Sequence, residues 1–184
     1  ANISYLDDKI GEVLATLEAT RQQAIVVFVS DHGDMLGERG LWFKMNFFEH
    51  SARVPLSIAL PGERGGTVRT PVSTLDVMPT LCDLAGIATA DTAPWCDGES
   101  LTATMQGTGG RGPVPMEYAA EGSITPLVAL RDGRYKLIVC PADPPLLYDL
   151  ETDPHELVDL AGHPEQGLGE PGGEGGADGG ARGD

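Results

Sequence analysis

A carboxylate and an imidazole follow a strongly apolar segment near position 30. The run 24–29 is followed, after Ser30, by Asp31, His32 and Gly33. Carboxylate oxygen and imidazole nitrogen both bind divalent cations, and just past the end of a strand two adjacent side chains can turn toward one ion. Gly33 would permit a sharp backbone turn there. Asp31 and His32 are therefore candidate metal ligands, although an Asp-His pair in a loop is more often a cap and a surface histidine.

Two further charged residues are candidates for a site. Lys44 ends the aromatic segment Trp-Phe-Lys, and beside a metal site its ammonium could stabilise negative charge on an ester oxygen. Glu121 stands in Ala-Glu-Gly at 120–122. Taken alone, each is more often a solvated surface charge. Glu49, His50 and Arg53 are predicted to serve the framework, as an ion pair or a loop anchor.

The elements around these residues predict an α/β fold. Apolar residues recur every three or four positions from Ile3 to Leu17, which predicts an amphipathic helix. The β-branched run 24–29 predicts a strand buried on both faces, as in a parallel sheet covered by helices. In such sheets ligands gather beyond the carboxyl ends of strands, which is where Asp31 and His32 stand.

The remainder of the chain predicts shorter elements and three regions. An Asp-Gly pair at 132–133 is typical of a hairpin in a small antiparallel sheet. The tail contains Gly, Glu, Ala and Asp with almost no apolar residues, so we predict that it is disordered. The predicted elements are a strand at 54–60, a helix at 74–86, connections at 35–53 and 87–112, and strands at 127–130, 135–139 and 146–150. The predicted regions are an α/β part at 1–112, a small C-terminal antiparallel subdomain at 113–166 and the tail at 167–184.

Composition excludes several classes of function. The formal charge of −16 argues against nucleic acid as a partner, because phosphate binding needs clustered Lys and Arg. No apolar run reaches the ~18 residues of a membrane span. Three scattered cysteines without CxxC spacing predict neither a zinc cluster nor disulfides, and they favour a reducing, cytoplasmic environment.

Several segments, in this order, resemble the sulfatase family, and choline sulfatases in particular. The long block Val29–Lys44, VSDHGDMLGERGLWFK, carries most of the resemblance, which covers about residues 1–165. Further matching segments lie at 1–11, 47–56, 120–122 and 148–157. The resemblance implies the alkaline-phosphatase-like α/β fold with a smaller C-terminal sheet.

The resemblance also implies an activity and roles for the candidate residues. The reaction would be hydrolysis of a sulfate ester, here choline O-sulfate to choline and sulfate. Asp31 and His32 would be the second pair of metal ligands, with Ca, Mg and Mn all compatible. Lys44 would contact the sulfate, and Glu121 would lie near the quaternary ammonium, a cation that is held by charge and aromatic faces.

Other parts of the family pattern do not occur in these 184 residues. In the family a Cys or Ser within Cys-x-Pro-x-Arg becomes formylglycine, and an early Asp pair completes the metal site; neither segment is found here. We therefore expect the C-terminal part of a sulfatase, inactive alone, whose full-length form is a homo-oligomer. The Gly-rich end departs from the usual polar tail, so we expect a truncated or frame-shifted gene end.

Two alternatives remain open. A phosphonate or phosphate ester hydrolase of the same superfamily would share the metal and lysine positions. A non-catalytic fragment that binds a metal weakly is the second alternative, because two ligands rarely hold a divalent ion tightly.

Overall fold

The structure, a computed structural model, describes residues 2–87, 96–120 and 122–162. In chain order its elements are α1 (Asn2–Ala19), β1 (Val26–Val29), β2 (Met35–Leu36), the 3-10 helix η1 (Glu38–Gly40), β3 (Trp42–Phe43), α2 (Glu49–Ala52), β4 (Leu56–Ala59), the 3-10 helix η2 (Thr74–Asp76), α3 (Val77–Leu84), α4 (Thr102–Met105), β5 (Val114–Tyr118), β6 (Leu127–Asp132), β7 (Tyr135–Cys140) and β8 (Asp143–Asp149).

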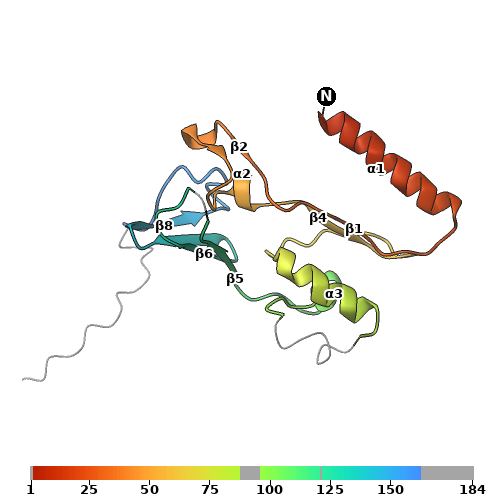
Figure 1. The fold of residues 1–184 in the computed structure, drawn as a ribbon. Helices are drawn as coiled ribbons and strands as arrows, with labels where there is room; N and C mark the ends of the chain where they lie inside the picture. Colours follow the sequence, from red (N-terminus) through yellow and green to blue (C-terminus); the bar gives the residue numbers. More distant parts are fainter. Residues whose placement is uncertain (1, 88–95, 121, 163–184) are drawn as a thin grey trace, which may run out of the picture.

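The α/β part is built around β1 and β4, with α1 and α3 on either side of the pair (Figure 1). The predicted helix and both predicted strands are present. The prediction of a parallel strand buried on both faces was wrong for the described residues, because β1 pairs antiparallel with β4 and Phe28 is 42% exposed. A continuous apolar run does not encode the direction of its partner strand. Within the described ranges α1 has no buried residue, so it does not pack closely on the β1–β4 sheet.

The helix predicted at 74–86 is confirmed as η2 followed by α3. A capping box starts it: the Ser73 side chain accepts from the Leu75 N–H, and the Asp76 carboxylate accepts from the Ser73 N–H at 2.8 Å. Gly86, with φ of 73°, follows its last turn. Asp76 is fully buried and also forms an ion pair with Arg111 at 2.7 Å, which fastens the helix start to the segment before β5.

The predicted connections contain short elements that the sequence did not reveal. Residues 35–53 form the β2–β3 hairpin, η1 and α2, and residues 102–105 form α4. Helices and hairpins this short have little intrinsic stability, so tertiary contacts must hold them. Thr80 provides one such contact: its buried hydroxyl accepts from the Leu101 N–H at 2.8 Å, just before α4.

The C-terminal sheet has the order β5-β6-β7-β8 and is antiparallel throughout. The three predicted strands and the hairpin at Gly133, whose φ is 51°, are confirmed. β5 was not predicted; its Pro115 is tolerated because β5 lies at the sheet edge. A hydrophobic core of Phe47, Ala129, Ile138 and Tyr148 joins the sheet to the segment before α2.

A buried charge cluster lies between the C-terminal sheet and α2. Lys136 of β7 is fully buried, and its Nζ lies 2.7 Å from Glu49 Oε1, 2.6 Å from Glu156 Oε1 and 2.7 Å from the Phe47 carbonyl oxygen. Glu156 is 1% exposed, and its Oε2 accepts from the Glu49 N–H at 2.7 Å. Arg39 donates to the Glu156 carbonyl oxygen. This cluster joins α2 to the sheet through both the side chain and the backbone N–H of Glu49.

The predicted tail at 167–184 lies outside the described residues. Among the residues that are described, no helix combines the length and apolar character required to cross a membrane.

We predict that Lys136→Met lowers the free energy of unfolding of the chain by roughly 3–5 kcal/mol, because it leaves buried carboxylates without their cation. Urea unfolding followed by circular dichroism measures this. Lys9→Met is the matched control, since Lys9 pairs with Glu12 at the surface and its loss should change stability by less than about 0.5 kcal/mol. Equal effects of the two substitutions would show that the cluster does not hold the fold.

Candidate active site

The loop after β1 is held against α2 at Gly33. The Gly33 N–H donates to the Ser51 carbonyl oxygen at 2.8 Å. A Cβ at Gly33 would lie 2.0 Å from the His50 carbonyl oxygen, so only a hydrogen fits there. The φ of Gly33 is not among the left-handed ones, and its part in a sharp turn stays a prediction. Close approach of α2, which the sequence does not show, requires the glycine.

The Asp31 carboxylate is exposed and anionic. The backbone N–H of His32 donates to Asp31 Oδ1 at 2.9 Å and lowers the pKa of the Asp31 carboxyl below its usual value. Asp31 Oδ2 lies 3.3 Å from His32 Nε2, and the Asp31 side chain is 82% exposed. An open hollow beside it is lined by Val29, Ser30, Asp31, Thr74 and Val77. The carboxylate is therefore free to accept a ligand from solvent.

The His32 ring is oriented by its own loop. His32 Nδ1 lies 2.8 Å from the Gly33 carbonyl oxygen, an acceptor, so Nδ1 carries the proton. The Nε2 lone pair then faces Asp31 Oδ2 and the Lys44 ammonium, whose Nζ lies 2.6 Å away. A carbonyl that fixes the tautomer in this way is a common support for a metal-binding histidine.

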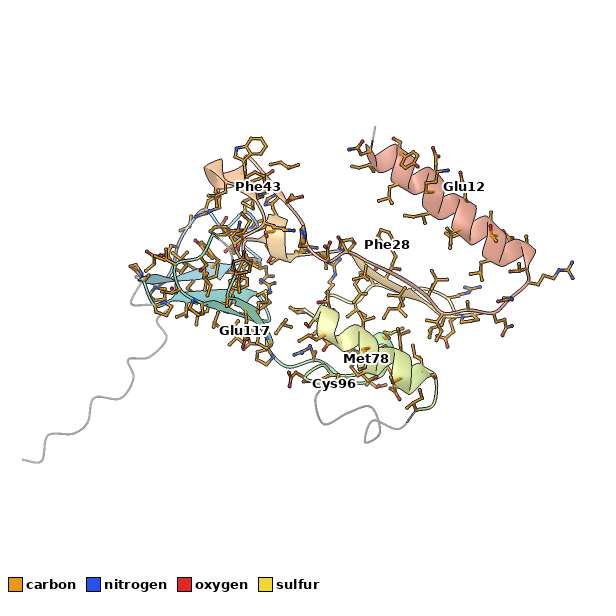
Figure 2. The ribbon with its side chains drawn as sticks, in the orientation of Figure 1. Glu12, Phe28, Phe43, Met78, Cys96 and Glu117 are labelled. Carbon is orange, nitrogen blue, oxygen red and sulfur yellow. The ribbon has the colours of Figure 1, made fainter. Side chains whose placement is uncertain are left out.

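Lys44 approaches from the β2–β3 hairpin. The residue before it, Phe43, has φ of 69°, which is unusual for an aromatic residue. Phe43 is 68% exposed, and it lies on the hairpin (Figure 2). The Lys44 carbonyl oxygen accepts from the Ser51 hydroxyl at 2.5 Å. Backbone strain that is retained next to a candidate site residue is typical of functional loops.

Asp31 and His32 offer the donors that a divalent cation requires. One carboxylate oxygen and one imidazole nitrogen, 3.3 Å apart, can contact a single ion. Within the described ranges no cluster of three or more His, Cys, Asp or Glu side chains could hold a metal. The donor set fits a divalent ion, and such an ion would need further ligands. A bound ion would coordinate to His32 Nε2 and so displace the Lys44 ammonium from that nitrogen.

The fourth predicted site residue, Glu121, lies outside the described residues. Its neighbour Gly122 is described, and a Cβ there would lie 3.6 Å from Met45 Cβ. Gly122 therefore lies close to the residue after Lys44.

Two of the expected framework residues, Glu49 and His50, are the first residues of α2. Glu49 forms the ion pair that was predicted for it, with Lys136. His50 contributes its carbonyl to the Gly33 contact, and its ring stacks on His155 with centroids 6.1 Å apart. Ser51 was not predicted to matter, because no local pattern distinguishes a buried serine from a surface one.

Comparison with known proteins agrees with this architecture. The family model described as Sulfatase matches residues 1–87. A choline-sulfatase of Rhizobium meliloti (strain 1021) is 58% identical over 166 residues, covering 89% of this chain and 32% of that protein. The multifunctional alkaline phosphatase superfamily protein PehA of Trinickia caryophylli is 32% identical, covering 88% and 35%. The chain thus spans about a third of the length of these relatives.

Solved structures show the same fold. BT4656, in complex with its substrate D-glucosamine-2-N,6-O-disulfate, superposes with a TM-score of 0.73 at 26% identity, covering 89% of this chain and 35% of that one. The phosphonate monoester hydrolase of Agrobacterium radiobacter gives 0.72 at 29% identity, covering 89% and 36%. The fold is therefore that of the alkaline-phosphatase-like hydrolases. Together with the family match and the identity to the choline-sulfatase, this establishes that the chain belongs to the sulfatase family.

We predict that Gly33→Ala lowers the free energy of unfolding by about 1–3 kcal/mol, because the new methyl group forces α2 away from the loop. Urea unfolding measures the effect. Gly65→Ala is the matched control: nothing lies within 4 Å of a Cβ there, so stability should hold or rise by up to about 1 kcal/mol. An unchanged midpoint for Gly33→Ala would mean that the loop and α2 are not in contact.

Proposed function

We propose that this chain supplies one side of the active site of a sulfuric ester hydrolase whose substrate is choline O-sulfate. The observation that carries the proposal is the convergence of two loops at His32 Nε2, which lies 3.3 Å from Asp31 Oδ2 and 2.6 Å from Lys44 Nζ. The 58% identity to a protein named choline-sulfatase supports the choice of substrate.

Each residue has a role that follows from its chemistry. A divalent cation (Ca, Mg or Mn), held by Asp31, His32 and ligands from outside this chain, would withdraw charge from the sulfuryl group. The Gly33 carbonyl oxygen keeps the His32 proton on Nδ1 and leaves Nε2 as a donor of electrons. Lys44 donates hydrogen bonds to a sulfuryl oxygen and stabilises the charge that develops there.

The nucleophile would come from outside these residues. In the sulfatase pattern it is a formylglycine formed within Cys-x-Pro-x-Arg, a segment that does not occur in the 184 residues. We propose that this chain alone does not turn over substrate. The tests below use the protein encoded by the complete reading frame that contains the chain, called here the full-length protein.

Glu121 would recognise the choline end of the substrate. A quaternary ammonium has no N–H to donate, so charge and aromatic faces must hold it. A Cβ at Gly122 would lie 3.6 Å from Met45 Cβ, so the residues that follow Glu121 and Lys44 are close in space, which supports both side chains serving one substrate.

A second candidate function is hydrolysis of a phosphonate or phosphate ester. The PehA protein and the phosphonate monoester hydrolase are both similar to this chain at about 30% identity. The higher identity to the choline-sulfatase favours the sulfate ester.

We predict that the full-length protein hydrolyses choline O-sulfate with a higher kcat/KM than aryl sulfates and phosphate monoesters. Glu121→Gln should raise KM for choline O-sulfate far more than for a sulfate ester of a neutral alcohol. Glu117→Gln, at an exposed position on β5, is the matched control and should change neither. An equal rise for both esters would remove Glu121 from the choline pocket, and preference for a phosphate ester would favour the second function.

Lys44→Ala in the full-length protein should lower kcat for choline O-sulfate by about two to three orders of magnitude, as expected for loss of one donor to the developing charge. Lys9→Ala, at the surface of α1, should leave turnover as it is. Steady-state kinetics decides the point: a Lys44→Ala protein with normal kcat would exclude the lysine from the reaction.

A further inference from the structure

Ser51 lies between the two loops that carry the proposed site. It is the third residue of the four-residue helix α2, and it is 2% exposed. Its two oxygen atoms serve different loops, and neither partner is a close neighbour in sequence. A buried residue with this pair of contacts can set the distance between the loops.

The backbone oxygen of Ser51 holds the loop with the metal ligands. It accepts from the Gly33 N–H at 2.8 Å, directly after His32. The Gly33 carbonyl oxygen, in turn, orients the His32 ring through Nδ1. Ser51 therefore acts on His32 through a single residue.

The Ser51 hydroxyl holds the loop with the lysine. It donates to the Lys44 carbonyl oxygen at 2.5 Å and fixes the backbone from which the ammonium extends. The strained Phe43 precedes this residue, so the hydrogen bond also offsets part of the cost of the left-handed conformation.

α2 itself is held by groups of the C-terminal sheet and of the segment after it. The Glu49 N–H donates to Glu156 Oε2 at 2.7 Å, and the Lys136 ammonium binds both Glu49 Oε1 and the Phe47 carbonyl oxygen. These groups are largely or fully buried. Through α2, Ser51 is thus anchored to the C-terminal sheet.

We propose that Ser51 is a positioning residue, which acts through Lys44 and sets the ammonium at its distance from the Asp31–His32 pair. The inference rests on the proposed function and deepens it. Its hydroxyl serves only the lysine loop, whereas its backbone oxygen serves the loop with the metal ligands. Removal of the hydroxyl therefore displaces Lys44 and leaves Asp31 and His32 in place.

The test is a double-mutant cycle in the full-length protein with Ser51→Ala and Lys44→Ala. Ser51→Ala alone should lower kcat for choline O-sulfate about tenfold to a hundredfold, the cost of a misplaced group. In the Lys44→Ala background it should cost nothing further, since the side chain it positions is gone. Binding of Mn²⁺, measured by titration calorimetry, should be the same with and without the hydroxyl.

Thr80→Ala is the matched control. The Thr80 hydroxyl is equally buried and donates to the Asp76 carbonyl oxygen at the same 2.5 Å, but on α3. It should lower the melting temperature while leaving kcat unchanged, with no dependence on Lys44. Should Ser51→Ala fail to fold, Ser51→Cys keeps the size with a weaker donor and enters the same cycle.

The outcomes separate the two proposals. If the unmodified protein hydrolyses no sulfate ester, the proposed function fails. If it is active but Ser51→Ala leaves kcat unchanged, or multiplies the Lys44→Ala defect, or weakens Mn²⁺ binding as strongly as turnover, the positioning role is wrong while the function stands.

Discussion

The fold around the candidate site depends on one buried cation. Removing an ammonium from water costs several kcal/mol unless other groups replace its solvation. Lys136 meets this requirement with two carboxylates and a backbone carbonyl, all within 2.7 Å. The carboxylates of Glu49 and Glu156 in turn require the Lys136 ammonium to balance their charge. The segment before α2 and the segment after β8 must therefore pack against β7 together.

The position of α2 gives the site its geometry. Four residues make too short a helix to be stable alone, so the ion pair of Glu49 and the bond from its N–H to Glu156 fix where it lies. Once fixed, α2 presents one carbonyl to Gly33 and one hydroxyl to Lys44. Two loops that are separate in sequence are brought together by a short helix that the C-terminal part of the chain holds in place.

The sequence reveals those features that arise from local preference. The periodicity from Ile3 to Leu17 predicts α1, the Asp-Gly pair predicts the β6–β7 hairpin, and Gly86 marks the end of α3. The position of Asp31 and His32 after a strand predicts that they face a ligand, and the structure places them beside Lys44. Their part in catalysis remains a proposal.

Features that arise from distant contacts could not be predicted in the same way. Lys136 looks like an exposed strand residue, because its partner Phe47 lies 89 residues earlier in the chain. The contact that requires glycine at 33 is made by α2, which comes later in the chain. The antiparallel pairing of β1 depends on the direction of β4, which the residues of β1 do not encode. Burial of a polar group depends on partners that only the folded chain assembles.

A cation shared by Asp31 and His32 is tested most directly by a crystal structure of the full-length protein with Mn²⁺, whose anomalous scattering marks the ion. The geometry predicts an ion roughly 2.0–2.6 Å from an Asp31 carboxylate oxygen and from His32 Nε2, with Lys44 Nζ released from that nitrogen. An ion bound elsewhere, with these two side chains directed apart, would contradict the assignment of this site to a sulfuric ester hydrolase.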